Sequence, residues 1–104
     1  AKGQLGTDMD EAAGRASAEK VALCMLATIK AEVGELSRVK RFVRILGFVN
    51  SGPGFTRHPQ VLNGFSDLMV VAFGDGGKAP RSAVGAPSLP NGIPVEVEAV
   101  VELE

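Results

Sequence analysis

Two charged residues in the last quarter of the chain, Arg81 and Glu96, have the types and spacing for acid–base chemistry on a small anion. Arg81 stands at the start of one extended segment and Glu96 at the start of the next, and a short connection joins the segments. A guanidinium binds a carboxylate through two parallel hydrogen bonds, and a glutamate can hold and deprotonate a water molecule. If the two side chains lie side by side, they form an anion clamp and a base. The alternative is an ordinary cross-strand ion pair, which the spacing alone favours.

The single cysteine and the single histidine do not indicate a catalytic or metal centre. Cys24 lies in the middle of an apolar helical stretch without the basic neighbours that make a thiol reactive, so we expect it to be buried and inert. His58 lies in a loop before the second predicted helix, and nothing nearby supplies further ligands at metal-site spacing. We therefore expect no metal site, and a solvated histidine at or near the helix start.

Two further motifs have a simpler explanation than chemistry. Residues 74–78 resemble a phosphate loop, but a Walker loop needs a preceding strand and Ser or Thr after the lysine, where Ala79 stands. A basic cluster shares a predicted strand with Phe42, and three of its cations share a face with that ring, as in a groove for single-stranded nucleic acid. The simpler interpretation is a solvated face whose cations lie opposite glutamates of the last strand. The cluster consists of Arg38, Lys40, Arg41 and Arg44.

Composition limits the class of protein. The chain has 104 residues, enough for one domain, and 45% of them are apolar, which in so small a globule suggests burial against a second copy. A net charge of −1 argues against a nucleic-acid partner. No apolar run reaches the length of a membrane span, the first residues contain no signal-peptide core, and one cysteine is typical of a reducing cytosol. We therefore expect a cytoplasmic homo-oligomer without membrane contact.

Helical periodicity predicts two helices. The first spans about residues 9–33, with Asp8 and Glu11 as a capping pair at its start and Gly34 at its end. The second follows a cluster of turn-forming residues and ends at the glycine-rich run 74–77. The apolar residues that define the two faces are Ala18, Ala22, Leu26, Ile29 and Val33 in the first helix and Val61, Phe65, Leu68 and Ala72 in the second.

Three segments are predicted as strands: residues 39–50, residues 80–87 and residues 95–104. In the last of them apolar residues alternate with glutamates, so one face belongs to the core and the other is polar. The order helix, strand, helix, strand, strand is an α+β pattern in which two helices pack on one side of a sheet. Three strands are few for two helices to cover, so we expect a single domain over residues 1–104 with further strands before residue 1.

The last quarter of the chain also resembles a known family signature. An arginine-led segment, a Leu-Pro turn and a Glu-x-Glu-Ala strand follow one another as in the YjgF/RidA family, also labelled endoribonuclease L-PSP. Segments further upstream resemble the middle strand and the second helix of that family, so the resemblance covers essentially all 104 residues. The matching stretches are residues 47–50 with Phe55, 61–68, 81–84, 89–90 and 95–99.

The resemblance implies a fold, an assembly and a reaction. Family members have a sheet backed by two helices, similar to chorismate mutase, and form trimers with ligand sites in the clefts between subunits. Better-known members hydrolyse reactive 2-imino acids to 2-oxo acids and ammonia, and no metal or organic cofactor is implied. By position, Arg81 is implied to bind the substrate carboxylate and Glu96 to hold the attacking water. Asn63 is implied to lie near the pocket, and the backbone at Ala83 to meet the ligand.

The chain departs from the family pattern in two places. The additional strands at the start of most members carry an aromatic residue and a Ser-Gly-Gln segment that help line the pocket, and neither is present here. Ala86 and Pro87 stand where a smoother apolar strand is typical, and a proline removes one hydrogen bond from the strand ladder.

Two other functions stay open beside imino-acid deamination. One is non-catalytic binding of a small carboxylate or carbonyl metabolite at the same interface, which needs Arg81 but tolerates loss of Glu96. The other is the endoribonuclease and translation-inhibitor activity of the older family label. It would need the basic cluster at residues 38–44 to be exposed beside the pocket.

Overall fold

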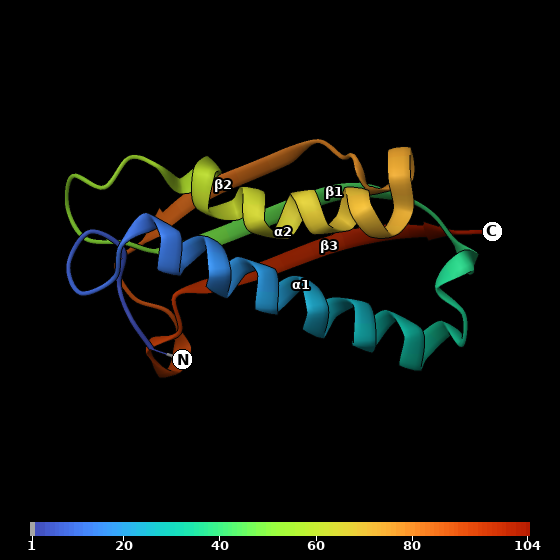
Figure 1. The fold of residues 1–104 in the computed structure, drawn as a ribbon, viewed down its shortest axis with the longest axis horizontal. Coiled ribbons are helices and arrows are strands. Elements are labelled where there is room, and N and C mark those ends of the chain that lie inside the picture. The colour runs from blue at the N-terminus through green and yellow to red at the C-terminus, as the bar shows by residue number, and fades with distance from the viewer. Residues whose placement is uncertain (1) are drawn as a thin grey trace.

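The computed structural model describes residues 2–104, which form two α-helices and three strands (Figure 1). Wherever the sequence predicts the first or last residue of a helix or strand, the observed element begins or ends within two residues of it. The strand predicted at residues 39–50 is confirmed. No helix in the described part of the chain is long and apolar enough to cross a membrane. In chain order the elements are α1 (Glu11–Val33), η1 (Leu36–Arg38), β1 (Val39–Asn50), α2 (His58–Phe73), η2 (Gly74–Gly77), β2 (Arg81–Ala86), η3 (Pro90–Gly92) and β3 (Val95–Leu103), where η marks a short 3-10 turn.

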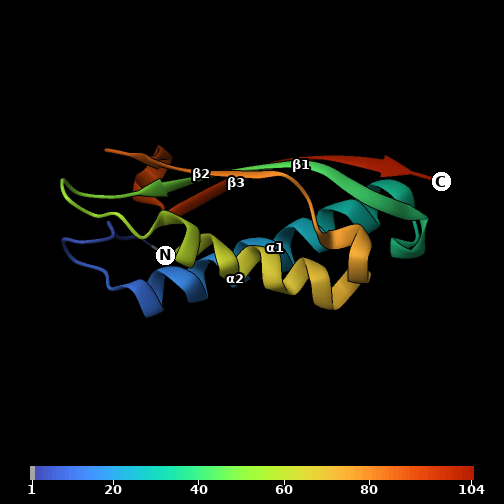
Figure 2. The same cartoon turned by 90° about the horizontal axis from the view of Figure 1, so that it is seen from above.

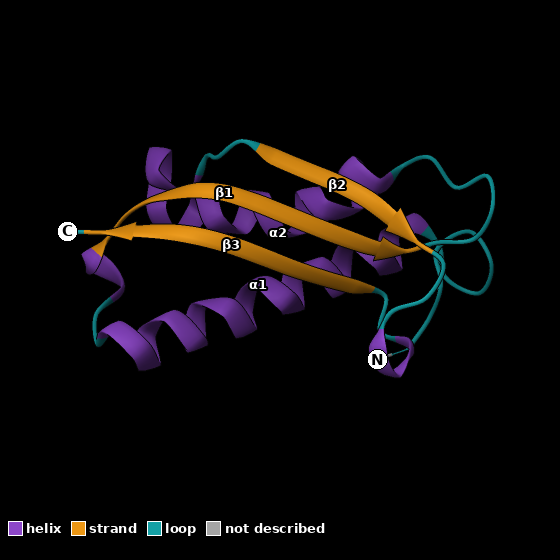
Figure 3. Cartoon of the chain, turned by 180° about the vertical axis from the view of Figure 1, so that it is seen from behind, coloured by secondary structure: helices purple, strands orange, loops and turns teal. Residues whose placement is uncertain are grey.

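The three strands form one mixed sheet in the order β2-β1-β3, with β1 parallel to β2 and antiparallel to β3. Parallel neighbours need a crossover connection, and α2 provides it between β1 and β2. Both helices pack against one face of the sheet (Figure 2), as the α+β pattern predicted. The opposite face carries no helix of the described chain (Figure 3).

Strand β1 separates β2 from β3, so the last two strands of the chain are not neighbours. One chain therefore does not place Arg81 and Glu96 side by side, and the cross-strand ion pair that the spacing alone favours is wrong. A short connection joins β2 to β3, but it carries the chain to the other edge of the sheet rather than into a hairpin.

The hydrophobic core fills the space between the two helices and the covered face of the sheet. α1 contributes the small residues Ala18 and Ala22, and α2 contributes larger ones. The two helices approach each other closely at Gly64, where a Cβ atom would collide with the backbone oxygen of Arg15. The buried apolar residues are Leu5, Ala18, Ala22, Val39, Phe42, Ile45, Val49, Val61, Leu62, Phe65, Met69 and Val95.

Helix α1 begins two residues later than predicted because Asp10, and not Asp8, caps it. The Asp10 carboxylate accepts a hydrogen bond from the backbone N–H of Ala13 at 2.9 Å. The Asp8 carboxylate instead accepts one from the backbone N–H of Gln4 at 2.6 Å, in the turn that precedes the helix. Asp8 and Asp10 both have the residue type that favours a helix N-cap. Which of them caps the helix depends on the path of the preceding turn, which the sequence pattern does not report.

Candidate active site

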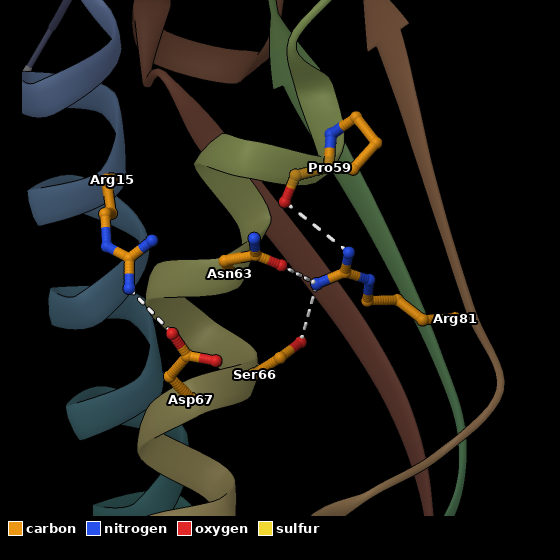
Figure 4. A network of polar contacts seen from close by, with 6 residues as sticks. All are labelled: Arg15, Pro59, Asn63, Ser66, Asp67 and Arg81. Atoms are coloured by element: carbon orange, nitrogen blue, oxygen red, sulfur yellow. Dashed lines mark hydrogen bonds and ion pairs between the residues drawn. The ribbon is translucent and has the colours of Figure 1, made fainter.

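Arg81 is the first residue of β2, and its side chain turns toward the helices because it pairs in register with the buried Ile45 of β1. Its guanidinium reaches α2, where Nη1 donates hydrogen bonds to Oδ1 of Asn63 at 2.8 Å and to Oγ of Ser66 at 3.0 Å (Figure 4). Nη2 donates a longer bond, 3.5 Å, to the carbonyl oxygen of Pro59. The structure therefore brings together two residues that the sequence nominated separately, Arg81 and Asn63.

These bonds leave one edge of the guanidinium for a ligand. Nη1 uses both of its hydrogens on Asn63 and Ser66, whereas Nε of Arg81 donates to no residue that the structure describes. Nε and the outer hydrogen of Nη2 form the edge that binds a carboxylate through two parallel hydrogen bonds. Protein oxygens thus fix the plane of the guanidinium, and the edge suited to a planar acid stays free.

Helix α2 can hold Arg81 because its polar and apolar residues occupy different faces. Asn63 and Ser66 are three positions apart and so lie on one side of the helix, toward β2. The fully buried residues of α2 pack on the core side. Ser66 was not predicted as part of the site, although its spacing from Asn63 is the signal that would have identified it. The fully buried residues of α2 are Val61, Leu62, Phe65 and Met69.

A pocket of about 220 Å³ opens beside this network, between α2 and the segment that leads into β2. Its volume lies below the roughly 300–1,000 Å³ typical of sites for drug-sized ligands, so it suits a small metabolite. Cationic, amide and hydroxyl groups share its wall with aliphatic side chains. The lining residues are Ile45, Asn63, Ser66, Asp67, Val70, Gly77, Lys78, Ala79 and Arg81.

Ala83 lies two residues after Arg81 on β2 and pairs with Gly47 of β1, so both Ala83 and Arg81 face the helices. The expectation that the backbone at Ala83 meets a ligand is compatible with this position but stays a prediction. Glu96, in contrast, pairs with Phe48 of β1, and residues paired in this way share a face. Phe48 is one residue from the buried Val49, so Phe48 and Glu96 point to the face without helices.

The structure therefore places Arg81 and Glu96 on opposite faces and opposite edges of the sheet. One chain alone does not bring the clamp and the base together. A site that uses both residues needs Glu96 from another copy of the chain, as the family resemblance implies.

Two of the remaining sequence candidates, Cys24 and His58, lie outside the pocket beside Arg81. Cys24 is exposed on α1, so the prediction that it is buried is wrong, because α1 packs another side, with Ala18 and Ala22, against the core. His58 is the first residue of α2, as predicted, and its Nε2 lies 3.1 Å from Oγ of Ser51. Within residues 2–104, no three His, Cys, Asp or Glu side chains gather as they would around a metal ion.

The structure supports the simpler interpretation of the basic cluster, in which its cations lie opposite glutamates of the last strand. Nε of Arg41 donates a 2.6 Å hydrogen bond to the carboxylate of Glu102, across β1 and β3 as predicted. The stacking role for Phe42 is wrong, because the ring is 1% exposed and packs against Phe73 in the core. Two register shifts interrupt the pairing of β1 with β3, one on each side of Phe42. Side chains do not alternate strictly between the two faces of the sheet there, so the residues that share a face differ from those predicted.

Gln4, which sequence reasoning missed, lies outside the pocket and contacts the end of β2 opposite Arg81. Its Nε2 donates hydrogen bonds to Oδ1 of Asn50 at 3.1 Å and to the carbonyl oxygen of Pro87 at 3.0 Å. Leu5 beside it is fully buried. The first residues of the described chain therefore fasten the ends of β1 and β2 to each other, which fixes the strand that carries Arg81.

Comparison with known proteins agrees with this architecture. The sequence profile of the family described as "YjgF/chorismate mutase-like, putative endoribonuclease" matches residues 1–103. The chain belongs to this family. A curated relative, Protein TCP17 of Trypanosoma cruzi, is 46% identical over 102 residues, which cover 97% of this chain and 64% of the relative.

Two solved structures of the same fold accompany this match. The protein Atu1372 of Agrobacterium tumefaciens, described as of unknown function, is 39% identical with a TM-score of 0.97, and the match covers 100% of this chain and 67% of that one. A protein of Shewanella oneidensis MR-1 described as a putative endoribonuclease is 34% identical with a TM-score of 0.93, and the coverage is 98% and 68%. The chain thus spans about two thirds of the length of these relatives.

Proposed function

We propose that the protein hydrolyses small 2-imino acids to 2-oxo acids and ammonia, with Arg81 as the carboxylate clamp. The observation that carries this proposal is the guanidinium of Arg81, held by Asn63 and Ser66 with its Nε–Nη2 edge free. Family membership supports it, since the sequence resemblance implies this reaction. A bidentate contact fixes both the position and the rotation of a small substrate, and orientation alone lowers the barrier of a readily hydrolysed imine.

Glu96 takes the role of base in the proposed reaction. It accepts a proton from a water molecule as the water oxygen forms a bond to the imine carbon, and the C=N electron pair moves to nitrogen. Glu96 returns this proton to the nitrogen, which gives the neutral carbinolamine. The carbinolamine hydroxyl then loses its proton to Glu96 as the C–O bond becomes a carbonyl and the C–N bond breaks, and Glu96 passes that proton to the departing nitrogen, which leaves as ammonia. The net reaction converts one imino acid and one water molecule into one oxo acid and one molecule of ammonia. It requires no oxidant or reductant. These steps use no cofactor.

The proposed assembly is a homotrimer with sites between subunits, because Arg81 and Glu96 face opposite ways within one chain. The uncovered sheet face is a suitable contact surface: Val84 is 41% exposed and Val100 50% exposed on it, beside the half-buried Leu46 and Phe48. Apolar residues on an open sheet face favour burial against another copy. We place the protein in the cytoplasm on the basis of its single cysteine.

The test of the proposed reaction is ammonia release from freshly generated 2-iminobutanoate and 2-iminopropanoate. The wild type is expected to accelerate release, and Arg81→Ala to lose most of that acceleration. Arg38→Ala is the matched control, because Arg38 is an exposed arginine of η1 that lies outside both the pocket and the uncovered sheet face. Equal rates for the wild type and Arg81→Ala would refute the proposal.

A second candidate function is binding of a small carboxylate metabolite without turnover. The observation that favours it is the separation of Glu96 from Arg81 within the chain, since a pure binding site needs only the clamp. Calorimetric binding of a 2-oxo acid that survives Glu96→Gln, with no ammonia release by the wild type, selects this function over catalysis.

Ribonuclease activity is the third candidate, since the S. oneidensis relative is described as a "putative endoribonuclease". Here the pairing of Arg41 with Glu102 and the burial of Phe42 remove two parts of the predicted nucleic-acid groove. Cleavage of RNA that disappears in a Lys40→Glu, Arg44→Glu double variant would support it.

A further inference from the structure

The pocket beside Arg81 contains a second cation, Lys78, the lysine at the end of the glycine-rich run 74–78, which the proposed reaction does not use. Lys78 caps the end of η2 in an extended conformation, three residues before Arg81. An extended chain advances at most about 3.3–3.6 Å per residue, so the two Cα atoms lie within roughly 10 Å of each other. The two cationic side chains therefore line one small cavity from adjoining parts of its wall.

Lys78 forms a weak ion pair within the chain. Its Nζ lies 3.2 Å from Oδ1 of Asp75, but the side chains are 67% and 97% exposed. Such an exposed pair is weak and screened by salt, so a ligand anion competes for the ammonium with little loss.

The pocket lining has an excess of positive charge, because Arg81 and Lys78 face a single carboxylate, Asp67. Asp67 accepts a 2.7 Å hydrogen bond from Nη2 of Arg15, an arginine outside the pocket (Figure 4). The Asp67 carboxylate is thus paired with α1. The pocket keeps the positive charge of Arg81, which has only neutral oxygen partners, together with that of Lys78.

We infer that the pocket selects a substrate with two acidic groups: a 2-imino dicarboxylate, with one carboxylate on Arg81 and the distal one on Lys78. This inference rests on the proposed function, since it assigns the first carboxylate to Arg81. Ser66 and Asn63 keep Arg81 in place while the longer, flexible lysine adapts to the second group. Lys78 is then a residue that determines specificity and takes no part in the chemical step.

The experiment is calorimetric binding of two stable product analogues to the full chain, 2-oxoglutarate and 2-oxopentanoate. Both have five carbons and a 2-oxo acid end, and they differ in the distal carboxylate. The wild type is expected to bind 2-oxoglutarate about tenfold more tightly, the gain of one charge-assisted hydrogen bond. Lys78→Gln is expected to remove that preference and to leave the affinity for 2-oxopentanoate unchanged.

Lys30→Gln is the matched control, because Lys30 is an exposed lysine in the last turn of α1, outside the pocket. It removes the same net charge and should keep the tenfold preference. Equal binding of the two acids by the wild type, or equal weakening of both by Lys78→Gln, overturns the inference about Lys78 and leaves the carboxylate clamp standing. Failure of the wild type to bind either acid overturns the clamp as well. The two failures are therefore distinguishable.

Discussion

Nη1 of Arg81 donates a 2.8 Å hydrogen bond to Oδ1 of Asn63, and this contact joins the first residue of β2 to the middle of α2. The partner residues come from elements that the chain reaches by a crossover, so the contact depends on the whole β1-α2-β2 unit. It presents the arginine in one orientation before any ligand arrives. The affinity for a carboxylate should therefore depend on residues that never touch it.

The first prediction concerns those supporting residues. Asn63→Ala and Ser66→Ala each free Nη1 to rotate, and we expect each to raise KM for a 2-imino acid about fivefold to tenfold, the value of one hydrogen bond to a charged group. The effect on kcat should be smaller, because neither residue meets the imine carbon. Steady-state kinetics of ammonia release separates the two parameters. Ser37→Ala, at an exposed serine of η1 outside the pocket and the sheet, is the control and should change neither. A loss confined to kcat would contradict a positioning role.

The second prediction concerns Glu96 and its neighbour Glu98, which lies on the same face of β3. Glu96→Gln keeps the shape of the side chain but cannot accept a proton, so kcat should fall by about 100-fold or more. Binding of a 2-oxo acid should be nearly unchanged. Glu98→Gln removes the same charge from the same face and should retain activity. Equal losses in both variants would show that the face needs negative charge in general and no particular base.

The third prediction concerns the packing of the two helices at Gly64. Any side chain at this position must displace the backbone of α1 at Arg15, which is less easily moved than a side-chain end. Gly64→Ala should therefore lower the free energy of unfolding by about 1–3 kcal/mol, although alanine favours a helix. Urea denaturation measures this change. Ala72→Ser, at an exposed position of the same helix, should lie within about 0.5 kcal/mol of the wild type.

The fourth prediction concerns the ion pair of Glu11 and Arg57, which links the start of α1 to the loop before α2. The hydrogen bond from Arg57 lowers the pKa of the Glu11 carboxyl below its ordinary value. A group with a lowered pKa in the folded state stabilises above its unfolded pKa, and the contribution disappears as the pH falls through the folded value. Arg57→Gln should thus lower the urea midpoint slightly at pH 7 and not at about pH 2–3.

A double-variant cycle provides the control for this pair. In the Glu11→Gln background the substitution Arg57→Gln should have no further effect at either pH, because the charge that it paired with is absent. An effect of Arg57→Gln that persists at low pH would show that the residue acts through packing or capping.

The sequence was sufficient to predict the elements and to nominate Arg81 and Asn63, the two residues that the structure joins. Strand β1 was predicted to the residue, and Asn63 and Arg81 were both nominated before their contact was known. Local periodicity reports which side of an element is apolar, and this information places helices and strands. It does not report which strands are neighbours, so the spacing of Arg81 and Glu96 alone does not reveal that β1 lies between their two strands.

Two other expectations failed for equally physical reasons. The bulges beside Phe42 shift the alternation of β1, and no residue type in that strand marks a bulge. Cys24 has apolar neighbours in the sequence, yet it is exposed, because α1 packs another side against the core: Ala18 and Ala22 are fully buried there, with Leu26 and Ile29 partly buried beside them. Which face of a largely apolar helix is buried depends on what packs against it.

The most direct test of the account mixes two inactive variants, Arg81→Ala and Glu96→Gln, unfolds them together and refolds them as mixed assemblies. If Arg81 and Glu96 of one site come from different chains, random mixing restores about a quarter of the sites in a cyclic assembly. The account predicts ammonia release from 2-iminobutanoate at about that fraction of the wild-type rate, while each variant refolded alone stays inactive. A mixture that assembles normally and stays as inactive as its components would contradict it.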